Sequence, residues 1–114
     1  MAEPFLERLT EIIENLNIIS GGGLVLESKH FFSGAALYAN GKICVTLTPA
    51  GFGLKLPIEI RNQLMEAGDG KELRYFDNGP IKKEYLTLSQ GVIDDPERLT
   101  KLIRQSMKYV VSKK

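Results

Sequence analysis

The sequence has few of the residues on which metal, redox and nucleophilic chemistry depend. Its 114 residues include one cysteine, one histidine and no tryptophan. A single cysteine permits no internal disulfide bond, and one cysteine with one histidine is too few for a typical structural zinc site. The formal net charge is only +1, which argues against a protein whose whole surface binds nucleic acid.

Two further absences bear on location. The first residues lack a basic stretch followed by an apolar run, and no apolar run of about 18 residues occurs later. We therefore expect a soluble, cytoplasmic protein that has no membrane partner. Because 43% of its 114 residues are hydrophobic, the chain can bury one core, and it is too short for a second. We expect a single domain over residues 1–114.

No constellation of catalytic residues stands out. A Cys44–His30 nucleophile pair would need the two side chains in contact and a third group to orient them. The glycines at 21–23 are not followed by the Gly-Lys-Ser/Thr of a phosphate-binding loop. We predict no catalytic, cofactor or metal site. The carboxylates considered as metal ligands are scattered and do not have the spacing of a metal site: Glu27, Asp69, Asp77 and Asp94.

Residues 31–57 carry the clearest structural signal, three strands joined by two turns. Asn40-Gly41 is typical of a two-residue hairpin loop, because both central residues need positive φ. If the strands pair without interruption, opposite residues share a face. Cys44 then falls in the middle of a strand, where we expect a structural thiol. The apolar side of this hairpin would comprise Ala36, Tyr38, Ile43, Val45 and Leu47.

Helices are expected before and after this meander in the sequence. Pro4 opens an apolar pattern of three- and four-residue spacing, and Gly68 ends a second pattern that starts at Pro57. Asp95 and Pro96 are a typical cap and first residue of the last helix. The expected segments are an N-terminal helix in 1–19, a glycine-rich connection in 20–30, a helix in 57–67, strands in 71–76 and 84–88 around a turn at 77–80, and a final helix from 96.

This order, α-β-β-β-α-β-β-α, predicts an α+β fold. Elements with one apolar face each are most simply buried in two layers, so we expect a mainly antiparallel five-stranded sheet with helices packed on one face. The core should then include Tyr38, Ile43, Val45, Leu47, Leu54, Leu64, Leu99 and Ile103.

Charges of opposite sign separate onto the first and last helices. Glu3, Glu7, Glu11 and Glu14 lie on or near one stripe, whereas Arg98, Lys101, Arg104 and Lys108 share a polar stripe. The plain interpretation is two solvated faces, with cations near a helix C-terminus. Three other arrangements would use the two charged faces. The first and last helices could lie side by side in one subunit, the acidic face could meet the basic face of a second copy in a two-fold homodimer, or the basic face could bind nucleic acid. We favour the homodimer over nucleic acid.

Six short motifs follow one another between about Lys29 and Val110. They are Phe-Phe-Ser-Gly-Ala-Ala-Leu-Tyr-Ala-Asn-Gly at 31–41, Leu-Lys-Leu at 54–56, Glu-Ala-Gly at 66–68, Tyr75, Tyr85 and Asp-Asp-Pro-Glu-Arg-Leu at 94–99. In the order and spacing of these motifs, this part of the chain resembles the N-terminal domain of the TfoX (Sxy) family of competence regulators. We take residues 31–114 as the family-like region. Ser33 and Ala36 replace two glycines of the family motif, and the second, helical domain of full-length members is not included.

The resemblance implies a two-layer α/β fold and a non-enzymatic regulatory or protein-interaction role connected with DNA uptake and transcription. Its partner would be a protein, for instance of the transcription machinery, and no catalytic residues are implied. The alternative is a small-ligand binding domain with a pocket between sheet and helices near Tyr38, Phe52 and Tyr85. A broad exposed apolar or charged face favours the interaction role over a ligand pocket.

Overall fold

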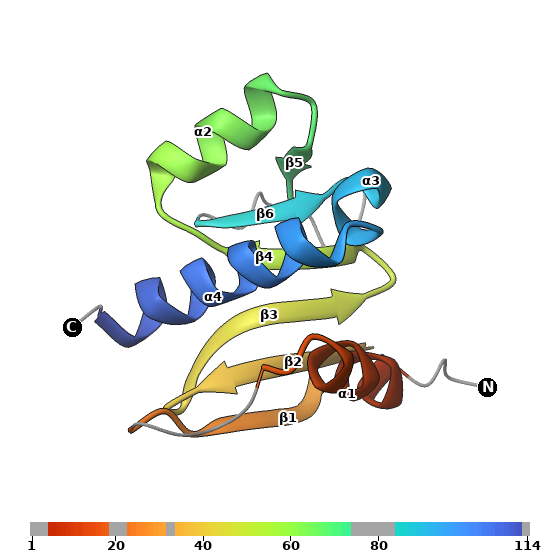
Figure 1. Cartoon of the computed structure of the whole chain (residues 1–114), viewed down its shortest axis with the longest axis vertical. Coiled ribbons are helices and arrows are strands. Elements are labelled where there is room, and N and C mark those ends of the chain that lie inside the picture. Colours follow the sequence, from red (N-terminus) through yellow and green to blue (C-terminus); the bar gives the residue numbers. More distant parts are fainter. Residues whose placement is uncertain (1–4, 19–22, 32–33, 74–83, 113–114) are drawn as a thin grey trace.

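The computed structural model describes residues 5–18, 23–31, 34–73 and 84–112. Within these residues six strands form one antiparallel sheet in the order β1-β2-β3-β4-β6-β5 (Figure 1). The elements are α1 (Phe5–Asn15), β1 (Leu26–Phe31), β2 (Gly34–Ala39), β3 (Lys42–Thr48), β4 (Gly51–Lys55), α2 (Ile58–Glu66), β5 (Gly70–Glu72), β6 (Tyr85–Leu88), α3 (Gln90–Ile93) and α4 (Pro96–Ser112).

The α+β class is confirmed, and the prediction of five strands was wrong. The additional strand, β1, lies in the stretch expected to be a glycine-rich connection. It pairs along its whole length with β2 and forms one edge of the sheet. Strand β5 is shorter than the strand predicted for 71–76, and the turn predicted for 77–80 lies outside the described residues. The short helix α3 was not predicted.

The hairpin between β2 and β3 turns where it was expected to turn. Asn40 and Gly41 both have positive φ, 51° and 81°, as a two-residue loop of this kind requires. The backbone N–H of Asn40 donates to the carbonyl oxygen of Val25, and the backbone N–H of Val25 donates to the side-chain oxygen of Asn40. Asn40 therefore also holds the chain that leads into β1.

A bulge in β3 changes the pairing that the sequence predicted. Tyr38 lies opposite Ile43, but the next residue of β2, Leu37, lies opposite Val45, so Cys44 is an extra residue. Because alternation shifts at the bulge, Tyr38 and Ile43 do not share a face with Val45. The prediction that both are core residues was wrong, since each is only half-buried. The other six predicted core residues are at most 7% exposed: Val45, Leu47, Leu54, Leu64, Leu99 and Ile103.

Side chains hydrogen-bond to carbonyl groups at the bulge and on the neighbouring strands. The thiol of Cys44 donates to the carbonyl oxygen of Leu37 over 3.3 Å. The hydroxyl of Ser106 on α4 lies 2.9 Å from the carbonyl oxygen of Cys44 and 2.7 Å from that of Lys55. Buried carbonyl groups require such partners, so the bulge and α4 stabilise each other.

The core lies between one face of the sheet and the helices α1 and α4. Figure 1 shows both helices on the same side, with α1 over β1 to β3 and α4 crossing β2 to β4. Leu9 of α1 and Ile103 of α4 are fully buried there. The two helices thus cover neighbouring parts of one face, and this arrangement positions the groove described below.

We expect the thiol of Cys44 to make stability depend on alkaline pH. Burial raises the pKa of this thiol to about 12, whereas an unfolded cysteine titrates near pH 8.5. Between these values the folded protein keeps the proton that the unfolded chain releases, so stability falls as pH rises. The loss from this one group should approach about 1.4 kcal/mol per pH unit.

Urea unfolding of the wild type and of Cys44→Ala between pH 8 and pH 11 measures this effect. Tyrosines and lysines titrate in both proteins, so the difference between the two curves isolates the thiol. The advantage of the wild type should shrink steadily above pH 9. Parallel curves over the whole range would show that Cys44 is not buried as described.

Candidate functional site

The four cations predicted to form a basic face are all exposed on α4, but one of them is engaged. Arg98 Nη2 lies 2.7 Å from the carboxylate of Asp69, between α2 and β5. The hydrogen bond to Asp69 and the negative charge of the Asp69 carboxylate raise the pKa of Arg98 above the usual value for arginine. Arg98 therefore ties the start of α4 to the α2–β5 connection, and it is not free to meet a partner.

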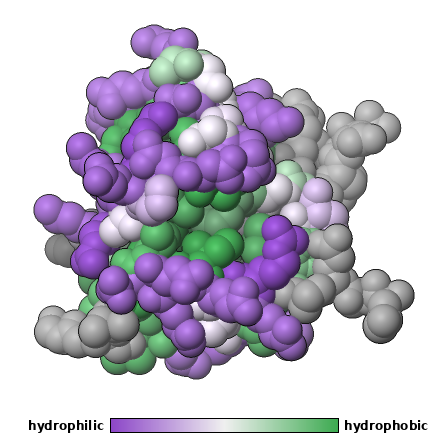
Figure 2. Space-filling view, turned by 45° about the vertical axis from the view of Figure 1, so that its right-hand side comes forward, coloured by the Kyte–Doolittle hydropathy of each residue, from purple (hydrophilic) through white to green (hydrophobic). Residues whose placement is uncertain are grey.

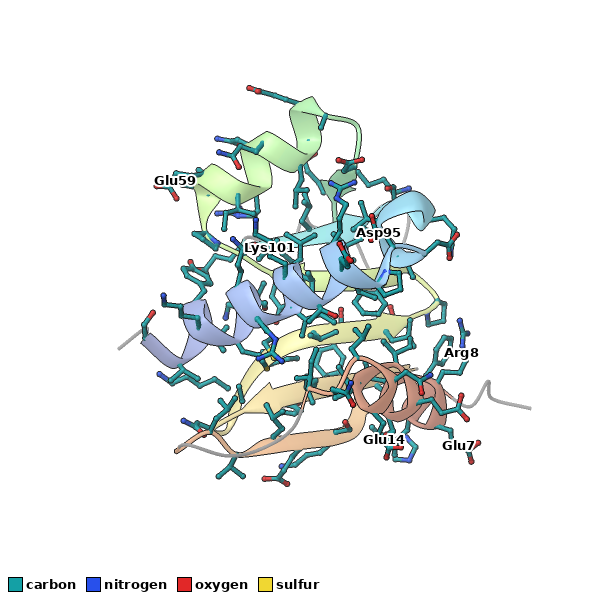
Figure 3. The ribbon with its side chains drawn as sticks, viewed as in Figure 1. Glu7, Arg8, Glu14, Glu59, Asp95 and Lys101 are labelled. Atoms are coloured by element: carbon teal, nitrogen blue, oxygen red, sulfur yellow. The ribbon has the colours of Figure 1, made fainter. Side chains whose placement is uncertain are left out.

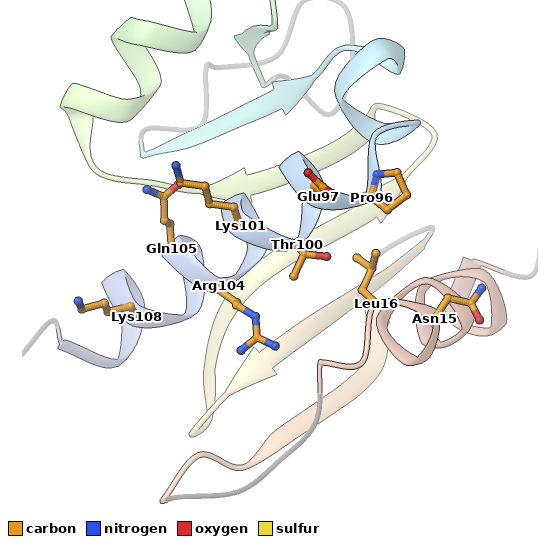
Figure 4. A pocket seen from close by; sticks show the side chains of 9 residues that line it. All are labelled: Asn15, Leu16, Pro96, Glu97, Thr100, Lys101, Arg104, Gln105 and Lys108. Atoms are coloured by element: carbon orange, nitrogen blue, oxygen red, sulfur yellow. The ribbon is translucent and has the colours of Figure 1, made fainter.

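The other three cations border a groove. Lys101, Arg104 and Lys108 have no ion-pair partner among the described residues, and they line a hollow of about 650 Å³ between α4 and the end of α1. Figure 4 shows Leu16, directly after α1, across this hollow from Thr100. The remaining lining residues are Asn15, Pro96, Glu97 and Gln105.

A second hollow, of about 720 Å³, lies along the same side of α1. Ile12 lines it, and Leu16 lines the first hollow one helical turn further on. Figure 2 shows an apolar hollow between hydrophilic rims on this side of the molecule. We call the two hollows together the α1–α4 groove, of which α4 lines only the first hollow. The second is also lined by Phe5, Arg8, Leu47, Thr48, Pro49, Gly51, Phe52, Gln90 and Ile93.

The three aromatic residues predicted for a ligand pocket do not come together. Phe52 is buried at the second hollow, opposite Leu47 in the sheet. Tyr38 and Tyr85 lie on the other face, as strand alternation from Phe52 and from its neighbours in the ladder requires. Each tyrosine ring lies near a lysine instead, with ammonium-to-centroid distances of 5.2 Å for Tyr38 and 5.7 Å for Tyr85.

The residues considered for catalysis are also apart. His30 is exposed on the edge strand β1, whereas Cys44 is buried in β3, on the far side of β2. Over residues 5–18, 23–31, 34–73 and 84–112, no group of three or more histidines, cysteines or carboxylates could hold a metal ion. In the same ranges, no helix is both long enough and apolar enough to cross a membrane.

The acidic stripe of α1 faces away from the basic stripe of α4. Glu7, Glu11 and Glu14 are exposed, and Figure 3 shows Glu7 and Glu14 on the side of α1 remote from α4. No ion pair joins described residues of α1 and α4. The two stripes therefore do not neutralise each other within one subunit, which was one of the three arrangements considered.

Fold and groove together define an α+β domain that offers an apolar hollow with a basic rim. The chain matches the TfoX N-terminal domain over residues 21–110. It therefore belongs to this family, as its motifs predicted. The match begins before Lys29 and so includes β1, the strand that the sequence patterns missed. A search of the curated proteins found no match.

Sequence reasoning identified the cations of the groove but not its walls. Ile12 and Leu16 continue the apolar pattern that opens at Pro4, and nothing in that pattern marks them as walls of a groove. Both are only partly buried and pack against the core from its margin. A helical period shows which residues avoid water, but it does not show whether a sheet covers them or they border a groove.

Proposed function

We propose that this chain is a non-enzymatic regulatory domain that acts in the cytoplasm by binding a protein partner. Membership of the TfoX N-terminal domain family supports a role connected with competence, the uptake of DNA, and transcription. The observation that carries the proposal is the set of three exposed cations, Lys101, Arg104 and Lys108, beside an apolar hollow. Such a surface suits association with another macromolecule.

The chemistry of the groove favours an acidic, amphipathic helix as its occupant. The first and last of the three cations are seven residues apart on α4, which corresponds to about 10 Å along a helix. Exposed ion pairs contribute only about 0 to 1 kcal/mol each, so the occupant must also place apolar side chains against residues such as Leu16 and Ile12. Carboxylates on one side of a helix and apolar residues on the other would meet both requirements.

A nucleic-acid partner fits this surface less well. Backbone phosphates attract continuous basic patches, whereas the carboxylate of Glu97 lines the first hollow together with the three cations. Arg98, the fourth cation of the stripe, is held by Asp69. The formal net charge of the whole chain is +1, which provides little long-range attraction for DNA.

Affinity capture from the native cytosol tests this proposal, with wild type, Arg104→Glu and Lys71→Glu as baits. Lys71 is exposed on β5, so its reversal makes the same change in net charge away from the groove. Bound protein and bound nucleic acid are both quantified. We expect one protein partner to be depleted at least tenfold on Arg104→Glu and retained on Lys71→Glu.

Two outcomes contradict the proposal. A partner retained equally by all three baits binds elsewhere on the domain. Bound nucleic acid that disappears on Arg104→Glu and with rising salt shows instead that the basic stripe contacts phosphates. Circular dichroism of each bait confirms that the substitution has left the fold intact.

A further inference from the structure

The acidic stripe of α1 and the basic stripe of α4 have matching spacings when the helices run antiparallel. Glu7, Glu11 and Glu14 are separated by four and then three residues. Read in the opposite direction, Lys108, Arg104 and Lys101 are also separated by four and then three residues. At 1.5 Å per residue, both stripes are about 10 Å long and offer three charges in register.

Both stripes are available to a second molecule. All six side chains are exposed, and none has an ion-pair partner among the described residues. Within one subunit the acidic stripe is turned away from α4 (Figure 3). Neighbouring like charges on one helix cost a few tenths of a kcal/mol each, so each stripe gains when opposite charges approach it.

We propose that α1 of a second copy of this chain docks antiparallel along α4, with its acidic stripe against the basic stripe. Glu7 would lie beside Lys108, Glu11 beside Arg104, and Glu14 beside Lys101. Two-fold symmetry repeats the contact with the roles of the subunits exchanged, because each copy carries both stripes. The apolar hollow beside α4 and Val111, which is 37% exposed one turn after Lys108, supply the apolar contact that exposed charges alone do not provide.

This inference rests on the proposed function, because it assigns to the second copy the same cations that the protein partner uses. Self-association and partner binding therefore exclude each other. The dimer is the resting state of the groove, and a partner with a better matching acidic helix displaces it. Variants in the acidic stripe of α1 then affect only self-association, whereas variants in the basic stripe of α4 affect both.

Light scattering on the purified full chain at about 0.15 M salt tests the pairing. The wild type should approach the mass of a dimer as its concentration rises, as should the control Lys71→Glu. Glu11→Arg and Arg104→Glu each place like charges opposite one another, and each should weaken the dimer at least tenfold. A dimer held partly by these charges should also weaken in 1 M salt, where the Debye length is about 3 Å.

Mixing the two single variants gives the sharper result. A heterodimer of Glu11→Arg with Arg104→Glu has an arginine opposite a glutamate at both of its contacts, while each homodimer has like charges at both. An equimolar mixture should therefore recover the dimer that neither variant forms alone. Recovery of this kind requires residues 11 and 104 to face each other across the interface. A general loss of folding in either variant could not produce it.

Three results overturn the inference. The wild type can remain a monomer at every concentration, a dimer can persist in both single variants, or the mixture can fail to recover. Each leaves the proposed function to its own measurement, because Glu11→Arg should still capture the protein partner while Arg104→Glu should not. If Arg104→Glu retains the partner but the mixture recovers the dimer, the proposed function fails and the self-association stands.

Discussion

Replacing Gly34 with alanine is expected to destabilise the protein by about 3 kcal/mol or more, which exceeds the cost of most single substitutions. A methyl group at this position would overlap the carbonyl oxygen of Leu47 and lie 2.8 Å from Cα of Thr48. Both are backbone atoms of β3, so the strand itself must move to accommodate the new atom. Urea unfolding followed by circular dichroism measures the change.

Gly91→Ala is the matched control. Gly91 lies in α3, and a methyl group there would meet no atom within 4 Å. Alanine is favoured over glycine in helices, so this variant should be neutral or stabilised by up to about 1 kcal/mol. If Gly34→Ala loses less than half a kcal/mol, β2 and β3 do not approach each other as described.

The result also bears on the family motif. Ser33 and Ala36 stand where the motif has glycine, while Gly34 keeps it. Ala36 is fully buried in β2, so the fold accommodates a methyl group at this position. Ser33 lies outside the described residues. At Gly34, where the backbone of β3 approaches, the chain has retained the glycine.

Truncation of Leu99 to alanine should cost about 2 to 5 kcal/mol, the usual range for a leucine that leaves a cavity in a core. Leu99 is 3% exposed and belongs to the apolar face with which α4 covers the sheet. Thermal or urea unfolding measures the loss. A change below half a kcal/mol would mean that α4 is not docked on the sheet.

Val111→Ala provides the comparison for Leu99→Ala. Val111 lies on the same helix and is 37% exposed. Its truncation removes less buried apolar area, so the expected loss is below about 0.5 kcal/mol. Because alanine is the best helix former, neither loss can come from helix propensity, so similar losses for both variants would argue against burial of Leu99.

The elements that the sequence predicted well begin or end with strong local signals. Asn40-Gly41 requires positive φ wherever it forms a tight turn, and both residues show it. Pro96 begins α4, and the carboxylate of Asp95 accepts the backbone N–H of Arg98 as a helix cap does. Such signals depend on a few adjacent residues, so they hold without knowledge of the tertiary structure.

The elements that were missed lack a local signal. Strand β1 carries Glu27, Lys29 and His30, and polar residues of this kind are typical of an edge strand that avoids pairing with other chains. The bulge at Cys44 changes the pairing of β3 with β2 and leaves no mark in composition. The prediction therefore assumed uninterrupted pairing, and this assumption alone assigned Tyr38 and Ile43 to the core.

The candidate site shows the same division. A helical period places Lys101, Arg104 and Lys108 on one exposed stripe, and the structure agrees. The same period includes Arg98, whose partner Asp69 is 29 residues away in the sequence. No pattern within the helix reveals such a long-range ion pair. The sequence therefore predicted the charge of the surface but overestimated how much of it is free.

The position of β6 in the sheet has a consequence for how the chain assembles. Strands β1 to β4 are neighbours both in sequence and in space, so turns of a few residues bring them together. In the described sheet β5 pairs with β6 alone, although β5 comes first along the chain. A chain growing on the ribosome can therefore complete the four-strand meander early. The place of β5 is available only after Leu88 has been synthesised, and the second half of the sheet then closes around that late strand.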